Sequence, residues 1–145
     1  MTEPAPSRHR IVVGVDGSPQ SIGALRYART LAEALGHDLE ALGAWQVRTT
    51  FEQYSPADWN PEADAREVLE EAVTEAFGSE RPANLSLRLE MGPPAQVLLD
   101  ASKTAAMIVV GTRGRGGFRG MIMGSVSSNV AAHAHCPVVI SHGEE

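Results

Sequence analysis

The fold of this chain is decided by residues 108–130, which read IVVGTRGRGGFRGMIMGSVSSNV. The apolar run at 108–110 predicts a buried strand. A segment follows in which glycine occupies positions 111, 114, 116, 117, 120 and 124. After it, Val126, Val130, Ala131 and Ala134 recur at helical spacing. The predicted order is therefore a strand, a glycine-rich loop and a helix that begins near residue 125.

This order of elements is typical of phosphate binding. Glycine permits positive φ and lets a ligand approach without meeting a Cβ atom. The first N–H groups of the following helix, together with its positive dipole end, favour an anion. Arg113, Arg115 and Arg119 add positive charge to the same loop. The stretch therefore predicts an anion site, with phosphate as its candidate ligand.

Outward from this stretch, the apolar patterns predict four further strands and three further helices. The four further strands are expected at 10–15, 39–47, 84–90 and 137–141, in addition to the strand at 108–110. The three further helices are expected to begin near Pro19, Pro61 and Pro94. Strands that alternate with helices predict a parallel sheet with right-handed crossovers and helices on both faces.

The strand patterns also predict the order of the sheet. The continuous apolar run at 10–15 suits a central strand, whereas the alternation at 84–90 suits an edge strand with one wet face. The fold class is therefore α/β, an open five-stranded sheet in the order 3-2-1-4-5. Ligands bind such sheets where the winding direction reverses, here between the first and fourth strands, whose carboxyl ends carry Asp16 and Gly111.

Length and composition bound the class of protein. With 145 residues, the chain is expected to form one domain at 10–145 behind a disordered tail at 1–9. Twelve basic against eighteen acidic residues argue against a broad nucleic-acid or anionic-membrane surface. No signal peptide or membrane-length apolar run is visible, and the single Cys136 fits a reducing compartment. We therefore expect a soluble cytoplasmic protein.

Two well-known phosphate loops do not match. Gly111 and Gly116 have the separation of a Walker loop, but Gly117 stands where that loop needs lysine. A dinucleotide fingerprint should follow the first strand, where this chain has VDGS after Gly14. Both a P-loop and a Rossmann dehydrogenase are therefore disfavoured.

A third spacing does match a family. Two residues separate Gly111 from Gly114, and nine separate Gly114 from Gly124-Ser125. With the opening IVVGVDGS and the closing HCPVVI, this pattern resembles the nucleotide-binding, single-domain members of the universal stress protein family over about 10–141. The resemblance implies an adenine nucleotide alpha hydrolase-like fold that binds ATP or another adenine nucleotide, with Mg²⁺ carried on the phosphates. Residues 105–107 depart from it, because AAM replaces an acidic residue often found before the fourth strand.

The resemblance also assigns roles to residues. Asp16 would contact the ribose or the nucleotide-borne metal, the end of the second strand would meet adenine, and the start of the fourth helix would donate N–H and hydroxyl groups to phosphates. The cofactor-binding residues so implied are Val15, Asp16, Gly17, Ala44, Trp45, Gly111, Arg113, Gly114, Gly124, Ser125, Val126 and Ser127. From the residues alone, the Asp16 carboxylate can hold Mg²⁺ or sugar hydroxyls, or it can simply shape an Asp-Gly-Ser turn.

Three functions stay open at this point. The first is an ATP-binding regulator of the stress response. The second is a slow ATPase or nucleotide-processing enzyme, although no catalytic residue is identified, because the loop offers neither a P-loop lysine nor an evident base. The third is a dimeric adaptor that works without nucleotide. An exposed apolar edge at Val138, Val139 and Ile140 predicts a homodimer in any of these.

Other features have simpler interpretations. The segment RGRGGFRG at 113–120 looks like an RNA-binding box, but a single copy in an acidic domain makes nucleic acid a minor alternative. The aromatic segment 48–60 either packs on its own domain or acts as a lid or a subunit contact. The glutamates at 67–75 suit a solvated helix face, and His133, His135 and Cys136 lack the arrangement of a metal site.

Overall fold

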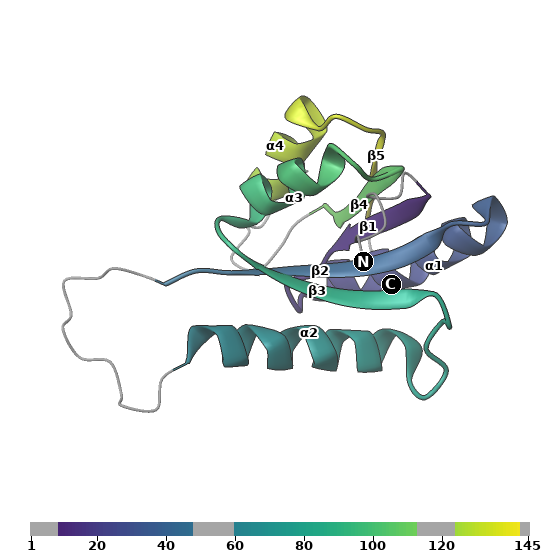
Figure 1. Cartoon of the computed structure of the whole chain (residues 1–145), viewed down its shortest axis with the longest axis horizontal. Coiled ribbons are helices and arrows are strands. Elements are labelled where there is room, and N and C mark those ends of the chain that lie inside the picture. Colours follow the sequence, from purple (N-terminus) through teal and green to yellow (C-terminus); the bar gives the residue numbers. More distant parts are fainter. Residues whose placement is uncertain (1–8, 48–59, 113–123, 143–145) are drawn as a thin grey trace, which may run out of the picture.

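The computed structural model describes residues 9–47, 60–112 and 124–142. Strands and helices alternate along them (Figure 1). The strands are β1 (Arg10–Gly14), β2 (Asp38–Trp45), β3 (Leu85–Met91), β4 (Met107–Gly111) and β5 (Val138–Ser141). The helices are α1 (Pro19–Leu35), α2 (Pro61–Phe77), α3 (Pro94–Ser102) and α4 (Ser125–His133). Every predicted element is present, with bounds that differ by one or two residues at most strand ends.

The five strands form one parallel sheet in the order β3-β2-β1-β4-β5. The predicted order is thus confirmed. Its cause lies in β1, where Ile11 and Val13 face one side and Val12 the other, all three fully buried. A strand that is apolar on both faces is stable only when helices cover both of them.

Two hydrophobic cores lie on the two faces of the sheet. One contains Ile11, Val13 and Val109 with the inner faces of α1 and α2. The other contains Val12 and Ile108 with α3 and α4. Figure 1 shows α3 and α4 together on one side of the sheet and α2 on the other. Among the helices of the described ranges, none combines the length and the apolar character that crossing a membrane requires.

The edge strand β3 has one dry and one wet face, as predicted. Leu85, Leu87 and Leu89 pack against the α1/α2 core. On the opposite face, Arg88 reaches Glu40 with an Nη1–Oε1 distance of 3.3 Å and Glu90 with an Nε–Oε1 distance of 3.2 Å. The alternation in the sequence therefore has a structural cause, since the polar side is stabilised by ion pairs rather than by a helix.

The first helix begins and ends where its sequence predicts. The Ser18 hydroxyl accepts a hydrogen bond from the Ser21 N–H group at 3.2 Å, and Pro19 occupies the first turn, where its missing N–H is not needed. The helix ends at Gly36, whose φ of +70° is the left-handed conformation that glycine adopts at low cost. This start fixes α1 directly after the carboxyl end of β1.

Candidate functional site

The turn between β1 and α1 is held by its own side chains. Asp16 Oδ1 accepts a hydrogen bond from the Ser18 N–H group at 2.9 Å, and Gly17 has a φ of +84°. Asp16 itself is exposed, whereas Val15 and Ser18 are buried. Asp16 therefore has the turn role considered from the sequence, and its carboxylate stands at the solvent side of that turn. Its role toward a ligand stays a prediction.

The end of β4 lies against the start of α1. β1 and β4 are paired in parallel, with Val13 opposite Val109, so their carboxyl ends are adjacent. A Cβ atom on Gly111 would come within 2.7 Å of Gln20 Cβ and 3.0 Å of Gln20 C. Glycine is thus required at 111 by helix packing alone, whatever ligand binds nearby.

The start of α4 is attached to the end of β4. The Gly124 N–H group donates to the Thr112 carbonyl oxygen at 2.5 Å, and Ser127 Oγ donates to the same oxygen at 2.8 Å. No side-chain hydrogen bond caps this helix within the part of the chain that the structure describes. The first-turn N–H groups of Ser125, Val126 and Ser127 are therefore available to an anion, and the helix dipole adds to their attraction.

The end of β2 extends beyond β1. Gly14, the last residue of β1, pairs with Leu42, so Ala44 and Trp45 continue past it. Ala44 packs against the α3/α4 core, and the Trp45 carbonyl oxygen accepts a hydrogen bond from the Gly92 N–H group at 2.7 Å. One of the backbone groups expected to meet adenine is thus already engaged by the turn that follows β3.

The structure brings most of the predicted residues to one edge of the sheet. Residues 15–17 and Gly111 follow adjacent strands, residues 124–127 are fastened to that same edge, and residues 44–45 extend from the neighbouring strand β2. Arg113 and Gly114 lie outside the described residues, as do the aromatic segment at 48–59 and most of the arginine-rich loop. Sequence reasoning missed Thr112, which is only 4% exposed and joins β4 to α4 through hydrogen bonds from Gly124 and Ser127.

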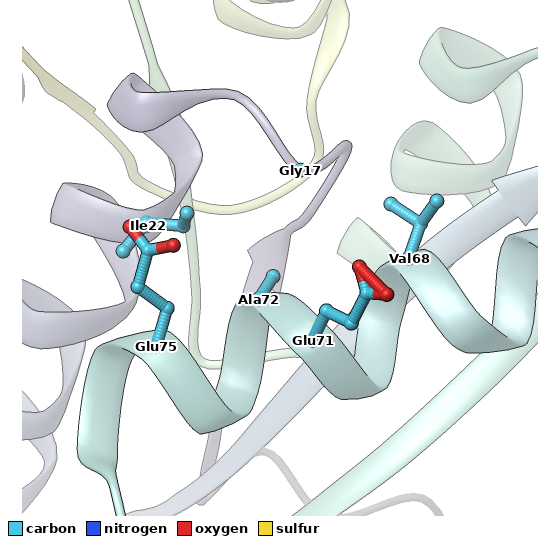
Figure 2. Close-up of a pocket in the computed structure, with 6 residues that line it drawn as sticks. All are labelled: Gly17, Ile22, Val68, Glu71, Ala72 and Glu75. Carbon is cyan, nitrogen blue, oxygen red and sulfur yellow. The ribbon is translucent and has the colours of Figure 1, made fainter.

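A separate hollow of about 90 Å³ lies between α1 and α2, next to Gly17 (Figure 2). Its walls come from α1 and α2, and Glu71 and Glu75 stand along the α2 side in the figure. It is lined by Gly17, Ile22, Val68, Glu71, Ala72 and Glu75. Two carboxylates repel phosphate, and the hollow shares only Gly17 with the predicted residues. We therefore place the candidate site at the start of α4 and not in this hollow.

The glutamates of α2 and the segment of His135 and Cys136 have structural roles. Glu71 and Glu75 are exposed, in agreement with a solvated helix face. The backbone N–H group of His135 donates to Ser102 Oγ at 3.0 Å, and Cys136 packs against the α3/α4 core. Within the described ranges, no three histidine, cysteine or acidic residues are grouped so as to hold a metal ion.

The fold and the arrangement at the carboxyl edge of the sheet define a class of protein, a doubly wound parallel α/β domain. Where the winding direction of the sheet reverses, a glycine-rich segment of the sequence leads into a helix. The model of the universal stress protein family matches residues 7–142. The chain belongs to this family.

Relatives and solved structures agree with that assignment. A universal stress protein of Mycolicibacterium smegmatis is 39% identical over 136 residues, and one of Mycobacterium tuberculosis is 36% identical over 141. These matches cover 92% and 95% of this chain but 46% of each relative, so the chain spans about half the length of these curated relatives.

Two solved structures share the fold along most of both chains. The universal stress protein UspA from Lactobacillus plantarum has a TM-score of 0.73 at 24% identity, with 94% of this chain and 99% of that one covered. A universal stress protein crystallised in complex with cAMP has a TM-score of 0.68 at 28% identity, with 94% and 98% covered. The fold class predicted from the sequence is thereby confirmed.

Proposed function

We propose that this protein binds an adenine nucleotide, with ATP as the first candidate, at the carboxyl ends of β1 and β4 and acts as a nucleotide-dependent regulator in the stress response. The observation that carries the proposal is the start of α4, which has no side-chain cap among the described residues and is fastened to the end of β4, the strand paired with β1, which leads into the Asp16 turn. The similar protein solved with cAMP supports an adenine nucleotide as the ligand class. Because the chain spans about half of its curated relatives, the regulatory activity is a proposal for this domain alone.

Each part of the site has a role in this proposal. The α4 start, with Gly124, Ser125, Val126 and the Ser127 N–H group, binds phosphate oxygens. Asp16 accepts from ribose hydroxyls or holds Mg²⁺ on the phosphates through oxygen. Val15, Gly17 and Gly111 border the nucleotide at the ends of β1 and β4, and Ala44 and Trp45 border adenine. Arg113 and Gly114, which lie outside the described residues, keep the role that the resemblance implies, next to the ribose and phosphates.

Binding rather than turnover is the proposed activity. Fast phosphoryl transfer needs a charge clamp, positioned metal ligands and a group that orients the nucleophile. Asp16 and the loop arginines supply charge, which supports slow hydrolysis at most. Phosphate release measured with and without Mg²⁺ separates the two activities, since a regulator turns over far more slowly than typical enzymes, whose kcat is about 10 s⁻¹.

We also propose a cytoplasmic homodimer whose contact includes β5. Among the strands of the described residues, β5 pairs with β4 alone, and its residues Val138, Val139 and Ile140 are half-buried. An apolar edge strand of this kind favours pairing with a second chain. A monomeric mass by light scattering at micromolar concentration would exclude the dimer.

The nucleotide proposal is tested on the purified protein in two steps. First, the protein is denatured and released small molecules are separated by chromatography, where adenine nucleotide is expected. Second, ATP is added during thermal unfolding, and at about 100 times its Kd it should raise stability by roughly 2.7 kcal/mol. If the protein releases no nucleotide and ATP causes no melting shift, the nucleotide-free adaptor is the better account.

A bulky residue at Gly124 provides a matched variant for that test. Gly124 is buried at the start of α4, so Gly124→Val should obstruct the phosphate position and displace its N–H group. Ala131→Val, at an exposed position of the same helix, is the control. ATP should stabilise the control and not the Gly124 variant, and equal binding by both would mean that the phosphates lie elsewhere.

A further inference from the structure

We infer that Ser127 is a positioning residue, whose hydroxyl fastens the start of α4 to the end of β4 and does not bind phosphate. This inference rests on the proposed function and gives Ser127 a different role from Ser125, although the sequence places both serines in the same set of phosphate-binding residues. Ser127 is 3% exposed, whereas Ser125 is exposed.

The hydrogen bonds of Ser127 decide its role. Its Oγ lies 2.8 Å from the Thr112 carbonyl oxygen and 3.2 Å from the Gly124 carbonyl oxygen. Both partners are acceptors, so the single hydroxyl proton of Ser127 is directed to them. A phosphate that carries its usual negative charge needs donors. The Ser127 hydroxyl therefore has no proton left for it, and only the backbone N–H group of this residue can bind phosphate.

Thr112 is the point to which α4 is fastened. Its carbonyl oxygen accepts from both Ser127 Oγ and the Gly124 N–H group, two donors in the first turn of one helix. Its own N–H group donates to the Ser141 carbonyl oxygen in β5 at 2.9 Å. Because two bonds from one helix turn meet at a single oxygen that is fixed to the sheet, they restrict both the position and the tilt of the helix start.

This restriction has a consequence for ligand selectivity. The N–H groups of residues 125–127 contact phosphates only if α4 keeps its direction, whereas adenine and ribose are expected to contact β2 and Asp16. Loss of the Ser127 hydroxyl should therefore weaken binding of ATP much more than binding of adenosine. A change in global stability alone would not separate the two ligands at a temperature where every variant is folded.

Ser127→Ala tests the inference beside three other variants. Ser125→Ala removes the proposed phosphate-binding hydroxyl, Ser127→Thr retains Oγ, and Ser128→Ala removes an exposed hydroxyl from the same turn. Two quantities are measured for each: hydrogen exchange of the Gly124 amide without nucleotide, and the Kd values of ATP and adenosine by calorimetry.

Ser127→Ala is expected to speed Gly124 exchange and raise the Kd of ATP, each by about tenfold, as the loss of a buried hydrogen bond predicts. The Kd of adenosine should change by less than about twofold, which is well under 1 kcal/mol. Ser125→Ala should weaken ATP and leave Gly124 exchange unchanged, while Ser127→Thr and Ser128→Ala should resemble the wild type in both.

Unchanged Gly124 exchange in Ser127→Ala would overturn the inference, and so would equal losses of ATP and adenosine affinity. If the wild type binds no nucleotide, the proposed function fails, yet the exchange measurement still decides whether the Ser127 hydroxyl fastens α4. The two failures are thus distinguishable.

Discussion

The two ends of the sheet are built from different chemistry. In its amino-terminal half, long side chains make the contacts, as Arg10 donates to the Thr104 carbonyl oxygen at 3.0 Å and both Arg10 and Arg88 lie within 3.4 Å of Glu40. At the carboxyl end, glycine and small hydroxyl residues make them, mainly through the backbone, as Thr112, Gly124 and Ser127 show.

The difference shows how one sheet separates stability from binding. In the amino-terminal half, the charged side chains already form ion pairs with one another, and a ligand would have to displace them. At the carboxyl end, the described residues around the start of α4 are small, and no side chain among them caps the first-turn N–H groups, which favours an anion. We therefore expect loss of a paired charge in the amino-terminal half to lower stability and leave ATP binding unchanged, and loss of a polar group at the carboxyl end to weaken ATP binding. Gly111 is the exception, because α1 packs against it and its substitution should lower stability.

The largest effect is expected at Glu40, which is 9% exposed. Glu40→Gln leaves two guanidinium groups without their shared carboxylate. Removal of one partner from a buried ion pair costs roughly 3–5 kcal/mol, and the partial exposure of Arg88 reduces the expected loss to about 2.5 kcal/mol. Urea unfolding measures this change, and the Kd of ATP should stay as in the wild type.

Glu33→Gln is the control for Glu40, because Glu33 pairs with Arg29 in the exposed face of α1. Its loss should be under about 0.5 kcal/mol. If Glu40→Gln weakened ATP binding in fully folded protein, the two halves of the sheet would not be separate in function.

Gly111→Ala should have the next largest effect. Its new Cβ atom would meet the Gln20 backbone, which belongs to α1 and cannot rotate away. Overpacking of this kind costs about 2 kcal/mol. In Gly43→Ala, the nearest atom is the flexible end of Leu89 at 3.1 Å, so a smaller loss in the same urea experiment is expected. Equal losses would show that Gly111 is not restricted by α1.

The smallest effect separates the two roles of Asp16. Asp16→Asn retains an oxygen that can accept from the Ser18 N–H group, so stability should change by less than about 0.5 kcal/mol. Loss of the charge should raise the Kd of Mg²⁺-ATP by about tenfold, or 1.4 kcal/mol. An unchanged Kd would mean that Asp16 only shapes the turn.

Much of the fold could be predicted from the sequence because its signals are local. The apolar run of β1 indicates burial on both faces, and the alternation of β3 indicates an edge strand. The ends of α1 are indicated by Ser18-Pro19 and by Gly36. Strand order then follows from the parallel βα rule. The sequence alone therefore places the residues at the carboxyl ends of β1 and β4 next to one another.

Contacts between distant residues could not be predicted in this way. Ala131 shares the helical spacing of Val126, Val130 and Ala134, but the spacing does not show that Ala131 is exposed and Ser127 buried, with the Ser127 hydroxyl bonded to the Thr112 carbonyl. The spacing of Gly111 suggested ligand approach, whereas the packing of Gln20 already requires glycine. In both cases the deciding partner lies on another element, which periodicity does not report.

Amide chemical shifts during an ATP titration test whether a nucleotide binds at the carboxyl end of the sheet. Saturable changes are expected at Gly17, Ser125, Val126 and Ser127, with little change at Asp38, Glu40 and Arg88 in the amino-terminal half. Adenosine should shift Gly17 but leave the α4 amides nearly unchanged. Changes confined to the amino-terminal half, or no change at millimolar ATP, would contradict the placement of a nucleotide at the carboxyl end of the sheet.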